Sequence, residues 1–481
     1  MPLLDLQADP YAGGSLVFSA LAMPVVAIGG PSIFALKLVA LLWSAAGLAA
    51  WTALVDRYWG RRAAHLFAFL FVFGPPLFVV YNLIAMGSHA EVVTLSGVQL
   101  LVGYRYLYGG ARSTRALVAW SAVAGIATWF TYVSIVPFAV CVAIGLIGGA
   151  LPPRRWPALA AGFAAGLTPW IATNFLSGGR GLDVVVRTFH SGSTAPGRSI
   201  GGYFEYLGYL VRTGIPLGLR FPDVLAPLTG DAARRLLLAH VYLAGYVLSW
   251  GVLLIGCMVA AGRRTRGVVS TLRELARACV ELPLLIIFPL FVLLVAATDQ
   301  VFLENELAPF LPFRLMVPFI PPVMVVLAVA VAHLGARWRR PAVLALALIG
   351  CAGTLSVLAA GSSERPRIAA HARELGAEAM GHLLYYKHGS SMPVLNQRVA
   401  AMPEELRPAA YEGIGFSVAY HYPAGAAVAD IATTLTEVPP RYRGDAVFGA
   451  RLALGPGMEQ VPPVPPSERG RALLEAVSKV E

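Results

Sequence analysis

The sequence contains little charge for its length, and lysine is almost missing from it. Only 13% of the 481 residues are charged, whereas a soluble domain carries about 25%. Lys37, Lys387 and Lys479 are the only lysines, so arginine supplies nearly all of the positive charge. Hydrophobic residues make up 57% of the chain, which is more apolar surface than one water-soluble core could bury. This composition excludes an ordinary soluble protein and predicts an all-α integral membrane protein.

Cysteine is also scarce, and its four positions form no recognisable metal-binding motif. Cys141, Cys257, Cys279 and Cys351 lie in or beside apolar segments, and no two have the C-x-x-C spacing. We interpret all four as lipid-facing or core residues. The region after residue 360 has no cysteine, so no disulfide framework holds it together.

Long apolar runs predict a polytopic bundle of transmembrane helices. Ten segments are long and apolar enough to cross a bilayer of about 30 Å: 33–55, 63–81, 90–108, 116–132, 133–151, 156–176, 236–261, 281–298, 314–336 and 341–360. The continuous run 116–151 must turn near Tyr132. A shorter apolar segment, 14–28, contains Pro24 and is predicted to be a juxtamembrane helix.

Clusters of arginine predict the orientation of these spans. Every second loop is basic, which is typical of cytoplasmic loops and not of a groove for nucleic acid. The arginines concerned are Arg57, Arg61, Arg62, Arg105, Arg112, Arg115, Arg154, Arg155, Arg263, Arg264, Arg266, Arg273, Arg277, Arg337, Arg339 and Arg340. The loops 82–89, 177–235 and 299–313 then face the opposite side, as do both ends of the chain. We therefore predict a multi-pass protein of a bacterial inner membrane, with 1–360 as its transmembrane domain.

An N-terminus outside the cytoplasm needs a means of export. Residues 1–13 contain no signal peptide and no preceding helix. We expect a further N-terminal helix upstream of the given start; the alternative is translocation of a short tail that has no basic residues.

Two regions outside the spans are long enough to have structure of their own. The loop 177–235 mixes charged and aromatic residues, which suits either a lid over a membrane-surface site or an ordinary folded loop. The region 361–481 is predicted to be a small, mainly helical, extracytoplasmic soluble domain. Within it the pattern Pro-x-x-x-Arg-x-x-Ala-x-x-Gly occurs at 403–413 and again at 439–449. The period of 36 residues is typical of helix-pair repeats, although chance agreement is the alternative.

Three motifs, taken in order, resemble a family of membrane enzymes. They are DPYAGGS at 9–15, the pair RRAAH at 61–65 and GSHAE at 87–91, and PFRLMVP at 312–318. This order resembles the GT-C superfamily of polytopic glycosyltransferases, especially its protein-mannosyltransferase and aminoarabinose-transferase branch. The resemblance covers about 1–340. It implies transfer of a sugar from a polyprenyl-phosphate donor, with an acidic catalytic base in the first outer loop and a basic residue that binds the lipid phosphate.

The chain departs from that family at the catalytic position. The Asp-Glu pair of the first outer loop is absent from 1–13, so the resemblance leaves Asp5 or Asp9 as the catalytic base, or a residue upstream of the given start. In that last case the chain is an inactive fragment. Asp9 precedes Pro10, so a turn residue is the alternative interpretation.

Three other residues are candidates for substrate binding. His89 and Glu91 lie at the outer mouth of a span, where ionisable groups are costly and often functional; the alternative is an interfacial cap. Arg314 opens another span and could hold a phosphate through two parallel hydrogen bonds, or it could extend to lipid headgroups. Asp299, Glu304 and Glu306 could hold a divalent cation, or they form a solvated acidic loop.

The sequence thus leaves two classes of function open. The first is a membrane glycosyltransferase whose partners are membrane lipids, a lipid-linked sugar donor and an unidentified acceptor, without nucleic acid. The second is a non-enzymatic polytopic protein, either a transporter or an envelope scaffold. A transporter should contain inverted repeats and broken helices with ionisable groups near mid-membrane. The sequence shows no such repeat, which favours an enzyme acting at the membrane surface.

Overall fold

The computed structural model describes most of the apolar region and part of the C-terminal region. The described residues are 14–29, 33–83, 90–176, 182, 200–219, 232–265, 267–297, 312–335, 337–351, 391–421 and 428–454, with a few single positions between 377 and 388. Every element within them is helical. The chain divides into two compact units, a larger one from Pro2–Phe302 and Pro312–Ala360, and a smaller one formed mainly by Gly361–Glu481.

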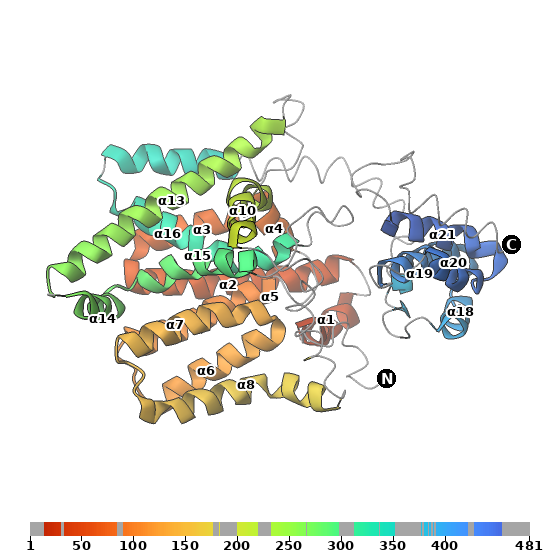
Figure 1. Cartoon of the computed structure of the whole chain (residues 1–481), viewed down its shortest axis with the longest axis horizontal. Coiled ribbons are helices and arrows are strands. Elements are labelled where there is room, and N and C mark those ends of the chain that lie inside the picture. Colours follow the sequence, from red (N-terminus) through yellow and green to blue (C-terminus); the bar gives the residue numbers. More distant parts are fainter. Residues whose placement is uncertain are drawn as a thin grey trace. The chain divides into compact units, whose positions relative to one another are not determined.

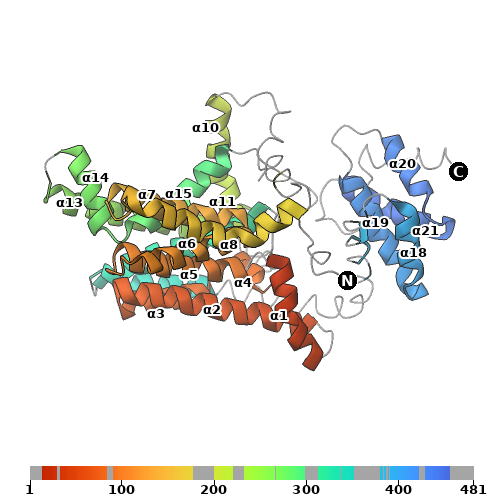
Figure 2. The same cartoon turned by 90° about the horizontal axis from the view of Figure 1, so that it is seen from below.

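The larger unit is a bundle of helices that run alongside one another (Figures 1 and 2). Its α-helices are α1 (Gly14–Gly29), α2 (Ile33–Trp59), α3 (Arg61–Val72), α4 (Pro76–Asn82), α5 (Ala90–Leu107), α6 (Thr114–Phe130), α7 (Ile135–Ile147), α8 (Trp156–Leu176), α10 (Ile200–Tyr209), α11 (Ile215–Gly218), α13 (Ala232–Gly262), α14 (Val268–Ala278), α15 (Leu282–Ala297) and α16 (Ile320–His333). Short 3₁₀ or π segments are η2 (Tyr132–Ser134), η3 (Pro153–Arg155), η5 (Leu210–Gly214) and η7 (Pro312–Phe319).

Some of these helices have the length and hydropathy of membrane spans. Within the described residues, three qualify: Lys37–Trp59, Ala239–Gly262 and Met316–His333. A fourth results if Val268–Ala278 and Leu282–Ala296, which are bent by 105° relative to each other, form one broken span. The structure therefore agrees with an all-helical membrane protein, and the count of ten spans stays a prediction.

Proline decides where two of the expected spans depart from a straight α-helix. The segment 63–81 divides into α3 and α4 at Gly74-Pro75, because proline clashes with the preceding turn and donates no hydrogen bond. The segment 314–336 begins as the 3₁₀ helix η7, which contains Pro318, before α16 starts. The turn expected near Tyr132 is confirmed, since α6 ends at Phe130 and α7 starts after η2.

Glycine brings α6 and α8 into backbone contact. A Cβ atom at Gly125 would collide with the Phe163 carbonyl oxygen, and one at Gly166 would collide with the Ala122 carbonyl oxygen. Gly162 and Gly166 have the spacing of four that places small residues on one helix face. These glycines therefore set the separation of the two helices.

The long loop predicted over 177–235 contains helices that pack on the bundle. The π-helix η5 joins α10 to α11, and the Tyr203 hydroxyl lies 3.5 Å from the Leu293 carbonyl oxygen of α15. His240 of α13 lies 3.3 Å from the Arg212 carbonyl oxygen. The described part of the loop is thus folded against the ends of α13 and α15 that carry the predicted outer loops.

The smaller unit shows the 36-residue spacing in its helices. They are α18 (Met392–Ala400), η8 (Glu404–Leu406), α19 (Arg407–His421), α20 (Val428–Thr436) and α21 (Pro440–Leu454). α20 starts and ends 36 residues after α18. Arg407 donates to the Ala400 carbonyl oxygen at 2.9 Å, and Arg443 donates to the Thr436 carbonyl oxygen at 2.9 Å. The same arginine contact therefore joins α18 to α19 in the first helix pair and α20 to α21 in the second.

Tyr411 provides a test of packing between these pairs. Its ring stacks on Tyr442 with centroids 5.0 Å apart, and its hydroxyl donates to Asn396 Oδ1 at 3.1 Å. Burial raises the pKa of Tyr411 to about 12 from 10.0. The neutral phenol is therefore favoured in the fold, so its contribution to stability is complete below pH 10 and is lost as the pH rises toward 12. The test measures tyrosinate absorbance against pH for the wild-type chain and for Tyr411→Phe. We expect the difference between the two curves to show a single inflection near pH 12. An inflection near pH 10 would contradict this packing.

Candidate functional site

Glu91 is the best-described of the predicted site residues. It lies in the first turn of α5, and its side chain has 0% exposure. The amino end of a helix carries a partial positive charge, which stabilises a carboxylate in the first turn. A buried carboxylate is nevertheless costly in an apolar bundle, and such residues are rare except where function requires them. Glu91 is therefore a strong candidate for a functional group.

Hydrogen bonds from α2 hold the first two turns of α5 in place. The Thr94 hydroxyl donates to the Trp43 carbonyl oxygen at 2.6 Å and to the Ala90 carbonyl oxygen at 3.0 Å. The Trp51 indole donates to the Val93 carbonyl oxygen at 2.9 Å. The bonds to Trp43 and from Trp51 link α5 to α2, so α5 is anchored to α2 two and three residues after Glu91.

Close approach of α2 and α5 depends on small residues. A Cβ atom at Gly97 would lie 2.6 Å from Trp51 Cδ1, and one at Gly47 would lie 2.9 Å from Thr94 Oγ1. Larger side chains at these positions would separate the helices and break the bond between Trp51 and α5.

The carboxyl end of α4 is fixed by a second group of polar contacts. The Ser44 hydroxyl donates to the Asn82 carbonyl oxygen at 2.7 Å, and Asn82 Nδ2 donates to the Phe78 carbonyl oxygen at 2.8 Å. Asn82 Oδ1 is buried and accepts no hydrogen bond from any described residue. This end of α4 begins the segment 83–89, which leads directly to Glu91.

The element that carries Arg314 packs at the same end of the bundle. The 3₁₀ helix η7 contacts α4, α5, α15 and α16. Its main chain is described at Arg314, whose side chain is outside the described residues. The structure thus brings together the elements that carry Glu91 and Arg314, and it leaves the distance between their charged groups as a prediction.

The remaining predicted residues lie outside the described part of the chain. Asp5, Asp9 and His89 fall there, and so do the acidic residues Asp299, Glu304 and Glu306. Their predicted roles as base, substrate ligand and cation ligands stay predictions. The helix expected over 14–28 is present as α1, which packs against the start of α2 through Phe18, Ala22, Val39 and Ala40.

Sequence reasoning overlooked the polar residues further along α5. Ser96 and Gln99 both have 0% exposure, and their side-chain polar atoms have no hydrogen-bond partner among the described residues. A buried amide without partners costs free energy, on the order of 1–3 kcal/mol. The available signal was polar residues at 94, 96 and 99 inside an otherwise apolar span.

The sequence analysis also overlooked the pairing of two cysteines. Cys257 and Cys279 are core residues, as one of the two interpretations expected, and they form a disulfide across 22 residues of sequence. The local spacing gave no sign of this pair, since the two residues meet only because α14 packs near the end of α13 (Figure 1).

Comparison of the chain with known proteins finds no matching family model, no similar curated sequence and no similar solved structure. The resemblance to polytopic glycosyltransferases therefore rests on the order of the three sequence motifs and stays a prediction.

Proposed function

We propose that the chain is a GT-C-like membrane glycosyltransferase of a bacterial inner membrane. It transfers a sugar from a polyprenyl-phosphate donor to an extracytoplasmic acceptor, and its C-terminal domain lies outside the cytoplasm. One observation carries the proposal: a buried acidic residue, Glu91, begins a helix against which the Arg314-bearing η7 packs. The predicted outer loops 82–89, 177–235 and 299–313 would surround the site at that end of the bundle.

The chemistry of the reaction needs groups of both signs at that place. A base must remove the proton of the acceptor hydroxyl, and Asp9 or Asp5 takes that role. Positive charge must stabilise the departing lipid phosphate, and the planar guanidinium of Arg314 can do so with two parallel hydrogen bonds. His89 and Glu91 orient the sugar between these groups.

The test is the replacement of Arg314 by lysine. Lysine keeps the charge but cannot form the bidentate pair with a phosphate. A hydrogen bond to a charged group contributes about 1.5–3 kcal/mol, so we expect about 10- to 100-fold lower kcat/KM for Arg314→Lys. The assay follows release of polyprenyl phosphate from a polyprenyl-phosphate-linked mannose by the purified full chain.

The matched control makes the same change at Arg340, which is exposed and belongs to a predicted cytoplasmic loop. Arg340→Lys should keep the wild-type rate. Equal rates for both variants and the wild-type protein would assign Arg314 to headgroup anchoring.

Two observations favour a transporter as the second candidate. The break between α14 and α15 turns the chain by 105°, and broken helices are typical of transporter binding sites. Ser96 and Gln99 also place inside the bundle polar atoms that have no hydrogen-bond partner in the described part of the chain. A transporter would bind a polar solute and would need Gln99 for that binding. It would release no polyprenyl phosphate, so the assay above separates the two functions.

A further inference from the structure

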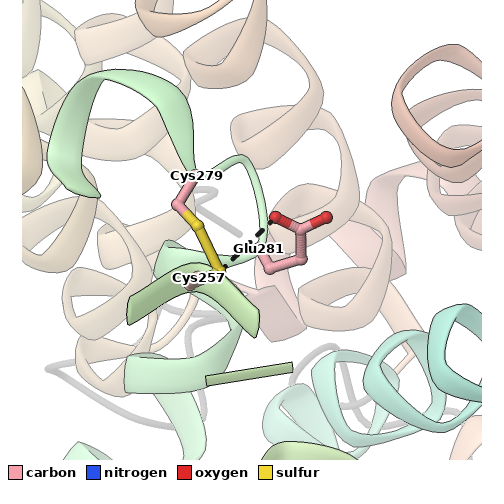
Figure 3. A group of neighbouring side chains, drawn as sticks. All are labelled: Cys257, Cys279 and Glu281. Carbon is pink, nitrogen blue, oxygen red and sulfur yellow. Dashed lines mark hydrogen bonds between the residues drawn. A yellow bond between two sulfur atoms is a disulfide. The ribbon is translucent and has the colours of Figure 1, made fainter. Parts of the chain in front are cut away.

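Three potential metal ligands from two distant parts of the chain meet at one place in the larger unit (Figure 3). Cys257 belongs to the last turns of α13, Cys279 follows α14, and Glu281 immediately precedes α15. The two Sγ atoms form a disulfide, with the Cα atoms 5.9 Å apart. Glu281 Oε2 lies 3.8 Å from Cys257 Sγ, and one ligand atom from each residue lies within 4.8 Å of the other two.

One aromatic side chain holds the carboxylate of this group, and a second holds the main chain beside it. The Trp59 indole donates to Glu281 Oε1 at 2.9 Å, and the Tyr104 hydroxyl donates to the Val280 carbonyl oxygen at 2.9 Å. One oxygen of Glu281 is thus occupied by a neighbouring donor while the other is directed at sulfur. Outer hydrogen bonds of this kind commonly orient metal ligands, and a disulfide has no need of them.

The surroundings indicate which redox compartment this group faces. Arg277, two residues before Cys279, donates to the Gly148 carbonyl oxygen at 2.7 Å. Arg155 donates to the Tyr106 hydroxyl at 2.6 Å, and that hydroxyl donates to the Ala150 carbonyl oxygen. The predicted cytoplasmic segments therefore gather around this end of the bundle. In the predicted orientation the cysteines face a reducing compartment, where a structural disulfide is rare.

We propose that in the reduced protein Cys257, Cys279 and Glu281 bind a thiophilic divalent cation of the zinc class. Each thiol gives up its proton when its sulfur binds the cation, so binding releases two protons. Two thiolates and one carboxylate oxygen complete three positions, and water takes the fourth of a tetrahedral site. Both cysteines are buried, with 5% and 8% exposure, which shields the site from competing ligands.

Such an ion would act as a cross-link at a structural break. It ties the end of α13 to the segment 279–281, where the chain turns by 105° between α14 and α15. The cation and the disulfide are alternative states of the same cysteine pair: a thiol reductant supplies the two electrons and two protons that open the disulfide, and is itself oxidised to a disulfide, before the cation binds. The proposal does not depend on the glycosyltransferase function.

Zinc ions alone are the probe for the test. The full chain is purified in detergent under reducing conditions, and its zinc content is measured by mass spectrometry together with competition against a chromophoric chelator. We expect one zinc per chain and protection of both thiols from alkylation by maleimide. Cys257→Ser and Cys279→Ser should each weaken binding by at least about 100-fold, and Trp59→Phe by about tenfold, because it frees the oriented carboxylate. Glu281→Gln should weaken zinc binding, and maleimide labelling should still count both Cys257 and Cys279 as thiols.

The matched control is Cys351→Ser, which removes an exposed cysteine elsewhere and should bind zinc as the wild type does. Two results would overturn the proposal. In the first, Cys257 and Cys279 in freshly isolated membranes do not react with maleimide until a reductant is added, and the reduced protein then binds no zinc. The second is one zinc per chain retained by both cysteine variants, which would place the ion at other residues.

Discussion

Replacing Glu91 by glutamine is expected to lower sugar transfer by about 100- to 1,000-fold while the protein still folds. Glutamine has nearly the same shape, so the contacts of α5 with α2 through Thr94 and Trp51 should persist. What is lost is the negative charge in the first turn of a helix, at the end where η7 packs. Groups that hold or accept a proton in a transition state commonly contribute 100- to 10,000-fold, and we expect the lower part of that range (about 100- to 1,000-fold) for an orienting carboxylate.

The measurement compares the rate of polyprenyl-phosphate release with the thermal unfolding midpoint of each variant. The control is Glu205→Gln in α10, which makes the same chemical change at an exposed position of the long loop. It should change neither quantity. If Glu91→Gln lowers the unfolding midpoint but keeps the wild-type rate, Glu91 serves only the stability of the bundle.

Replacing Gly166 by alanine is expected to destabilise the larger unit by about 1–3 kcal/mol, the usual cost of forcing an extra methyl group into a packed interior. The Cβ atom would overlap the Ala122 carbonyl oxygen and would also lie 2.9 Å from the Ile126 nitrogen. These are backbone atoms, which no side-chain rotation can move aside. α6 and α8 must therefore separate, and Gly166→Val should cost more than Gly166→Ala.

A helix glycine without neighbours provides the control for this substitution. Among the described residues, Gly251 in α13 has no atom from outside its own stretch of helix backbone within 4 Å of its Cβ position. Alanine is the better helix former by about 0.5–1 kcal/mol, so Gly251→Ala should leave the thermal midpoint unchanged or raise it. Thermal unfolding in detergent, followed by tryptophan fluorescence, tests both variants together. Equal midpoints for Gly166→Ala and Gly251→Ala would show that the contact of α6 with α8 is looser than the structure has it.

Local chemistry in the sequence was enough to predict several elements. The length of the apolar run 116–151 predicted the turn near Tyr132, and the structure shows α6 bounded there by the Ser113 cap and the extended residue Thr131. The 36-residue pattern corresponded to a real spacing of helices, because its arginines and alanines occupy equivalent contacts in both pairs. These features depend on interactions between residues close in sequence, or on a structural repeat that is visible as a recurring sequence pattern.

Part of the candidate site could also be predicted from the sequence. Glu91 stood out because it is ionisable at the mouth of an apolar span, and that argument needs no knowledge of its neighbours. The count of spans and of basic loops placed Glu91 and Arg314 at span mouths on the same predicted side. The packing of η7 against α4 and α5 came only from the tertiary structure, because more than 200 residues of sequence separate α5 from η7.

The sequence by itself determined that this chain is helical and apolar enough to belong in a membrane, because composition and the scarcity of charge decide the solvent in which a chain can fold. It also determined where several helices end, because proline, glycine and capping residues act locally. Only the tertiary structure decided that Cys257, Cys279 and Glu281 meet, that Ser96 and Gln99 are fully buried, and that Gly125 and Gly166 bring two backbones into contact. These results depend on which faces of distant helices pack together, and the free energy of that choice is spread over many contacts that no single stretch of sequence contains.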